Sequence, residues 1–107
     1  MAEILGRFEQ AVLLSVFRLR EEAYGRAILR DVQERLGREL AAGAVHATLE
    51  RLEQKGLIRS RIGQGTPIRD GRARRFYNLE ALGVEALNEA RAAHKTLWQG
   101  IRLPQKA

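Results

Sequence analysis

The sequence predicts a mainly α-helical domain that carries a two-stranded β-hairpin and ends in a long further helix. Apolar residues recur every three or four positions over three successive segments before residue 57, as they do along amphipathic helices. The period then changes to an alternation of apolar and polar residues, typical of a half-exposed strand, and a helical period returns near residue 81. A chain of 107 residues with 45% apolar and 30% charged residues suits one globular domain.

The first helix is expected over residues 4–19, where Phe8, Val12 and Val16 recur at helical spacing. Three more apolar residues widen this face, namely Leu13, Leu14 and Phe17. A helix that is apolar on most sides is buried by more than one neighbour. We therefore expect this helix to face a second subunit as well as its own core.

Two more helices are expected before the hairpin. The second covers residues 24–36, with Gly37 as its C-terminal cap. Gly25 lowers the helix propensity of the first turn, so we expect it to permit a close approach between backbones. The third helix begins near Gly43 and ends at Gly56, and its expected inner face consists of Val45, Leu49 and Leu52.

The hairpin is expected to pair residues 58–62 with residues 74–79 around a long loop, residues 63–73. This part of the chain carries the excess charge. From Lys55 to Tyr77 there are seven basic residues and one acidic residue, a difference of +6, which equals the formal net charge of the whole chain. Such a concentration of positive charge predicts a site that binds a polyanion.

The last helix is expected over residues 81–99, before Gly100 and Pro104. Its apolar stripe consists of Val84, Leu87, Ala90, Leu97 and Trp98, and it is interrupted by Arg91 and His94. Together with Ile101, the stripe offers more apolar surface than one small domain covers, which predicts burial in a two-fold interface. We therefore expect residues 1–80 to form one domain and residues 81–107 to form a dimerisation helix and tail.

The order helix, helix, helix, hairpin, helix is that of a winged helix-turn-helix, whose third helix enters the major groove of double-stranded DNA. The hairpin, or wing, then lies against the DNA backbone. The residues expected to face the groove are His46, Ala47, Glu50, Arg51 and Gln54. Phosphate contacts, which position the protein without reading bases, are expected from Arg59, Arg61, Arg69, Arg72, Arg74 and Arg75. Glu50 repels phosphate unless Gln54 or Arg51 pairs with it.

The chain resembles the PadR family of bacterial transcriptional regulators in three motifs. They are Tyr24-Gly25 at the second helix, TLERLEQKGLI at residues 48–58, and GRARRFYNL at residues 71–79 with Gly83 after it. In that family the second motif runs from the recognition helix into the wing, and the third is the returning wing strand. The resemblance covers about residues 8–99. One departure is His46-Ala47, where the family usually carries a Tyr-Pro pair for base readout.

The resemblance implies a homodimeric repressor, which in some members a small phenolic or drug-like effector releases from DNA. The residues expected at the dimer interface or effector site are Phe8, Val12, Leu87, His94, Leu97, Trp98 and Ile101. Two interpretations of Trp98 stand: it packs as an interface side chain, or it stacks on a flat aromatic ligand between the subunits. Two interpretations of His94 also stand: it is a partly buried polar residue, or it forms a pH-sensitive pair with the His94 of the second subunit across the two-fold axis.

Other classes of function receive little support. The two histidines are far apart in the sequence and there is no cysteine, so we expect neither a zinc site nor another cofactor. No nucleophile with an adjacent base is discernible, so we do not expect an enzyme. No apolar stretch is long enough to span a bilayer and no signal peptide is expected, which together favour a cytoplasmic location. The alternative function is a winged-helix interaction module whose basic wing binds RNA or an acidic protein.

Overall fold

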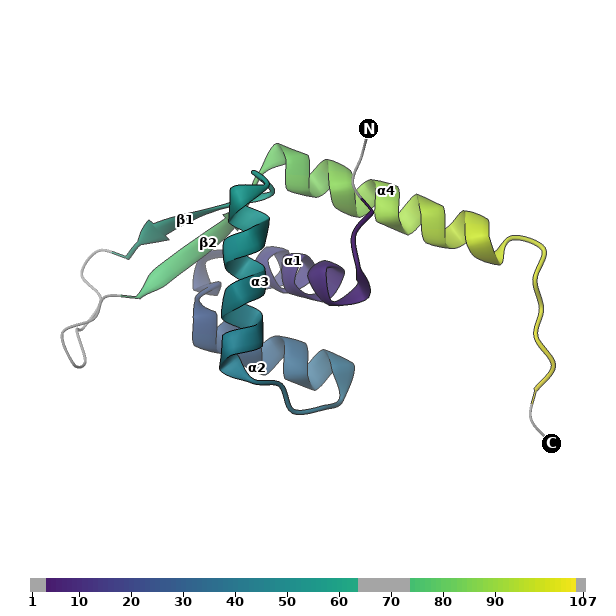
Figure 1. Ribbon diagram of the computed structural model, residues 1–107, viewed down its shortest axis with the longest axis horizontal. Helices are drawn as coiled ribbons and strands as arrows, with labels where there is room; N and C mark the ends of the chain where they lie inside the picture. The colour runs from purple at the N-terminus through teal and green to yellow at the C-terminus, as the bar shows by residue number, and fades with distance from the viewer. Residues whose placement is uncertain (1–3, 64–73, 106–107) are drawn as a thin grey trace.

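The computed structural model describes residues 4–63 and 74–105. Its elements follow the predicted order, and the described helices and strands are α1 (Arg7–Leu19), a short 3-10 turn (Arg20–Glu22), α2 (Gly25–Leu36), α3 (Ala42–Gln54), β1 (Ile58–Ile62), β2 (Arg75–Leu79) and α4 (Ala81–Trp98). The wing projects from one side of the core formed by α1, α2 and α3, and α4 extends from that core toward the other side (Figure 1). The predicted winged helix-turn-helix fold with a further C-terminal helix is confirmed.

The first helix begins three residues later than the sequence predicts. The carboxylate of Glu9 accepts a hydrogen bond from the backbone N–H of Gly6 at 3.0 Å, which satisfies a donor that the first turn leaves without an intrahelical partner. Leu5 precedes the helix but is buried, with 5% of its surface exposed. It therefore fixes the N-terminal segment against the core without being helical.

The core lies where α1, α2 and α3 meet the first residues of the wing. The predicted inner face of α3, Val45, Leu49 and Leu52, is confirmed, because each of these side chains is at most 2% exposed. The three residues that widen the apolar face of α1 are not all buried. Leu13 is fully buried, whereas the side chains of Leu14 and Phe17 are 44% and 52% exposed. Leu14 and Phe17 thus leave apolar surface on α1 beyond its own core, and the expectation that a second subunit covers it stays a prediction.

The wing is an antiparallel pair in which Ile58 lies opposite Leu79 and Ser60 lies opposite Tyr77. Residues directly opposite each other in such a pair share a face, so Ser60 and the buried Tyr77 point to the same side. A further antiparallel bridge joins Tyr24, at the start of α2, to Phe76 of β2. The wing is therefore attached along its β2 edge to the segment that opens α2.

Gly83 fixes the start of α4 against β1. A Cβ atom at this position would lie 2.3 Å from the carbonyl oxygen of Leu57 and 2.7 Å from a methyl group of Leu79, so only glycine fits without a shift. Gly25, which was expected to permit a close approach, has no other part of the described chain within 4 Å of a Cβ placed there. That expectation is not met within the chain, because the first turn of α2 borders open space.

Candidate nucleic-acid interface

The predicted groove-facing residues His46, Ala47, Glu50 and Gln54 are exposed on α3. The Nε2 atom of His46 lies 3.4 Å from a carboxylate oxygen of Glu50, one turn along the helix. The sequence left Gln54 or Arg51 as the partner of Glu50, but the structure pairs it with His46.

Arg51, the fifth residue of the predicted face, is turned toward α1. Its Nε atom lies 3.5 Å from Glu9 Oε2, and one of its terminal nitrogens lies 3.3 Å from Thr48 Oγ1. The ammonium group of Lys55 also contacts Glu9, at 3.1 Å. Glu9 thus ties the C-terminal half of α3 to the first turn of α1.

The carboxyl group of Glu9 is held in its charged form. Burial alone would raise its pKa, but the hydrogen bond from Gly6 and the charges of Lys55 and Arg51 outweigh that effect and lower the pKa below its ordinary value. The side chain is only 13% exposed. One cation of the predicted DNA-facing set, Arg51, therefore pairs with a charged carboxylate of its own chain while its side chain remains 49% exposed.

The described wing arginines fall into two groups. Arg59 pairs with Glu80 at 2.8 Å, and Arg75 donates to the hydroxyl of Ser60 at 2.9 Å. Arg61 and Arg74 instead lie over the rings of Phe76 and Tyr24. All four side chains are exposed. Two more predicted phosphate contacts, Arg69 and Arg72, lie outside the described residues.

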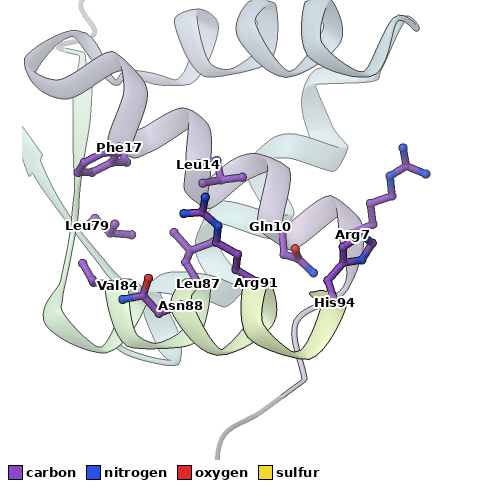
Figure 2. A pocket seen from close by; sticks show the side chains of 10 residues that line it. All are labelled: Arg7, Gln10, Leu14, Phe17, Leu79, Val84, Leu87, Asn88, Arg91 and His94. Atoms are coloured by element: carbon purple, nitrogen blue, oxygen red, sulfur yellow. The ribbon is translucent and has the colours of Figure 1, made fainter. Parts of the chain in front are cut away.

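A groove of about 890 Å³ separates α1 from α4. Its walls carry Leu14 and Phe17 on one side and Val84 and Leu87 on the other, as Figure 2 shows. Arg7, Gln10, Leu79, Asn88, Arg91 and His94 complete the lining. The sequence pattern marked Leu14 and Phe17 as surplus apolar surface but gave no indication that Arg7 would join them.

The residues predicted for the interface or effector site divide by position. Val12 is fully buried in the core of its own chain, so it has no surface for a partner and we remove it from the proposed interface. Phe8 and Leu87 are partly buried against the same core. The end of α4 is open: Leu97, Trp98 and Ile101 are 77%, 49% and 55% exposed. The exposed His94 has its ring 6.2 Å from that of Trp98.

Neither a metal cluster nor a membrane-spanning helix is found among the described residues. Over residues 4–63 and 74–105 there is no group of three or more His, Cys, Asp or Glu side chains placed to hold a metal ion. Among the described helices, none is both long enough and apolar enough to cross a membrane.

Comparisons with known proteins agree with this geometry. The model of the transcriptional regulator PadR-like family matches residues 13–89. A PadR family transcriptional regulator from Eggerthella lenta is 29% identical with a TM-score of 0.67, and the match covers 88% of this chain and 80% of that one. A PadR family regulator from Clostridium difficile is 28% identical with a TM-score of 0.65, covering 84% and 91%.

A PadR-like transcription factor from Bacteroides fragilis is 25% identical with a TM-score of 0.70, and the match covers 86% of this chain and 84% of that one. No curated protein sequence matches this chain. The family match runs from the second half of α1 through α2, α3 and the wing to the first half of α4. The chain belongs to the PadR-like family of transcriptional regulators.

Proposed function

We propose that the protein is a dimeric, sequence-specific repressor that binds double-stranded DNA through α3 and the wing. The observation that carries the proposal is the joint placement of an exposed helix face, from His46 to Gln54, and exposed arginines on an adjacent hairpin. In winged helix-turn-helix proteins these two surfaces meet the major groove and the neighbouring backbone. The wing supplies affinity for any duplex, and α3 supplies discrimination between sequences.

The proposed dimer uses the apolar surface that a single chain leaves open. Leu97, Trp98 and Ile101 lie at or just beyond the end of α4, and Leu14 and Phe17 lie on α1, where they line the groove opposite Val84 and Leu87. A two-fold interface buries the same patch on both subunits and places two α3 helices on a two-fold symmetric operator. In this proposal residues 1–80 bind DNA and residues 81–107 assemble the dimer.

The groove between α1 and α4 suits an effector of defined chemistry. Five of its ten lining residues are apolar, Arg7 and Arg91 add positive charge, and none of the lining residues is acidic. This combination favours a flat aromatic molecule that carries a negative charge, because the arginines attract the anion and the apolar side chains cover the ring. Because α1 and α4 are also the helices of the proposed dimer, binding of such a molecule would change how the two subunits are arranged. The changed dimer would then release DNA.

A second candidate function is supported by the modest charge of α3. Glu50 lies on its exposed face, and Arg51 is turned toward Glu9. A face of this kind can serve as a docking surface while the basic wing binds RNA or an acidic protein.

The deciding experiment compares two duplexes by fluorescence anisotropy across a salt series, one from upstream of the protein's own gene and one of scrambled sequence. Tight binding to the upstream duplex that persists at higher salt, with a large gap to the scrambled duplex, supports the repressor. Equal and steeply salt-dependent binding to both duplexes contradicts sequence-specific recognition and favours the second candidate. Sedimentation of the free protein tests the dimer separately.

The wing assignment is tested by the double change Arg74→Ala with Arg75→Ala. We expect weaker binding to both duplexes alike, with the salt slope reduced by about 0.9 for each phosphate that the wing no longer neutralises. The matched control is Lys95→Ala with Arg102→Ala, which removes two exposed charges from α4 and the tail. The control should bind as the unmodified protein does. Weakening confined to the upstream duplex would contradict the assignment of the wing to the DNA backbone.

A further inference from the structure

Four side chains on the wing and its edge form a row in which two aromatic rings lie between two cations. The Cζ atom of Arg61 lies 5.1 Å from the centroid of the Phe76 ring. That ring meets the ring of Tyr24 edge-on, with centroids 5.6 Å apart, and the Cζ atom of Arg74 lies 4.3 Å from the Tyr24 centroid. We call these four residues the wing stack. They come from β1, β2, the residue before β2 and the residue before α2.

The backbone holds Tyr24 at the centre of this stack. The carbonyl of Tyr24 accepts the first hydrogen bond of α2, from the N–H of Ile28 at 2.9 Å. The backbone of Tyr24 also forms an antiparallel bridge with Phe76. The preceding carbonyl, that of Ala23, accepts the N–H of Tyr77 at 2.8 Å. The ring therefore projects from a backbone that is bonded on one side to the helix-turn-helix and on the other to the wing.

The two arginines of the stack differ from the other described wing arginines in what their N–H groups contact. Arg59 and Arg75 donate to Glu80 and Ser60. Over the part of the chain that the structure describes, Arg61 and Arg74 have no carboxylate within ion-pair distance and contact only rings. A ring contacts a guanidinium group through its face and uses none of its five N–H donors. Those donors stay available for phosphate oxygens.

We infer that Tyr24 is a positioning residue for DNA binding: its ring, braced by Phe76, holds the Arg74 guanidinium where it meets a phosphate of the duplex. This inference rests on the proposed function. An arginine side chain that is already restrained before binding loses less rotamer freedom on meeting a phosphate than an unrestrained side chain does. One exposed cation–π contact corresponds to about 2- to 5-fold in affinity.

A double-mutant cycle on the full chain tests this with the scrambled duplex, because backbone contacts do not depend on sequence. Tyr24→Leu should weaken binding about 2- to 5-fold and leave the salt slope unchanged, since Arg74 still reaches its phosphate. Tyr24→Phe, which keeps the ring, should bind as the unmodified protein does. In the Arg74→Ala background, Tyr24→Leu should have no further effect.

The matched control repeats Tyr24→Leu in the Arg59→Ala background, where its full effect should remain because Arg59 pairs with Glu80 and not with a ring. Thermal unfolding confirms that each variant is folded. Should Tyr24→Leu not fold, the cycle is run with Tyr24→Met, which keeps the bulk of the side chain without a ring.

Additive effects in the Arg74→Ala background would overturn the inference, because Tyr24 would then act independently of Arg74. Weakening by Tyr24→Phe equal to that by Tyr24→Leu would also overturn it, since the hydroxyl and not the ring would matter. In both cases the unmodified protein still binds DNA. If the unmodified protein binds neither duplex, the proposed function itself fails, and that result is distinct from the other two.

Discussion

Glu9 is the residue that decides how much positive charge α3 presents. It contacts Arg51 at 3.5 Å and Lys55 at 3.1 Å while accepting the N–H of Gly6. A carboxylate placed so close to two cations competes with phosphate for them. The basic count of the sequence therefore overstates the positive charge that α3 presents at its surface.

Removing the charge of Glu9 should strengthen DNA binding. Glu9→Gln weakens the contact with Arg51, whose guanidinium then becomes available to a phosphate. We expect tighter binding to both the upstream and the scrambled duplex, and a salt slope steeper by about 0.9. The control is Glu9→Gln combined with Arg51→Ala, which should abolish the improvement. Tighter binding that survives in the combined variant would mean that overall charge, and not Arg51, is responsible.

A second, largely buried carboxyl links stability to pH. Burial raises the pKa of Asp31, but the hydrogen bonds and charge of Arg18, 2.6 Å away, outweigh it, so the pKa of this carboxyl is lowered from its ordinary 3.8. A lowered folded-state pKa adds stability that is present above pH 3.8 and is lost as the pH falls through the folded-state value.

Asp31→Asn should therefore lower the free energy of unfolding at neutral pH and change it little at acidic pH. Because Arg18 is about a third exposed, we expect a decrease of only about 1 kcal/mol at pH 7. Urea unfolding at several pH values measures it, and the difference from the unmodified protein should shrink below pH 3.8. A difference that stays constant across this range would show that the contribution of Asp31 does not depend on its charge.

At the scale of elements, the junction between the wing and α4 determines where α4 points. Gly83 lies in the first turn of α4 against the carbonyl of Leu57, and the N–H of Glu80 donates to the same carbonyl at 2.9 Å. The residue before β1 and the first turn of α4 are thus held in close contact. Since α4 carries the proposed dimer surface and β1 carries wing arginines, this junction sets the geometry between the two.

Gly83→Ala should destabilise the protein although alanine favours helices. The added Cβ would lie 2.3 Å from a backbone oxygen, so α4 must shift, at a cost of about 1–3 kcal/mol. The control is Gly25→Ala, in the first turn of α2, where nothing in the described chain lies within 4 Å. That change should be neutral or stabilising by up to about 1 kcal/mol. Equal effects in chemical unfolding would contradict the close packing at Gly83.

At the scale of the whole molecule, exposed apolar side chains lie on α1 (Leu14 and Phe17), at the start of α4 (Leu82 and Val84) and at its end. Leu97, Trp98 and Ile101 are about half exposed or more, whereas the core of the same chain is closed. Large apolar side chains left exposed in this way suit burial in an interface. The groove between α1 and α4 is lined by Leu14 and Phe17 on one side and by Val84 and Leu87 on the other (Figure 2).

Trp98→Ala should weaken the dimer at least tenfold if the indole packs against the second subunit, because removal of a buried tryptophan side chain costs about 3–5 kcal/mol. Sedimentation equilibrium measures the dissociation constant. The control is Leu82→Ala, which removes another exposed apolar side chain at the opposite end of α4 and should leave the dimer intact. A fully dimeric Trp98→Ala protein would exclude the packing role and favour stacking on a ligand.

The sequence by itself determined the order and type of the elements and the inner face of α3. The spacing of Val45, Leu49 and Leu52 alone places them on one side of α3, and the alternation after Gly56 alone predicts a strand, because these periods depend only on local backbone geometry. It also located the excess charge. Only the tertiary structure decided which cation meets which partner: Arg51 faces Glu9, Arg59 faces Glu80 and Arg74 faces Tyr24. Each arginine side chain is long enough to reach several partners, so the partner that it contacts depends on how distant elements pack. The complete burial of Val12 depends on the same packing.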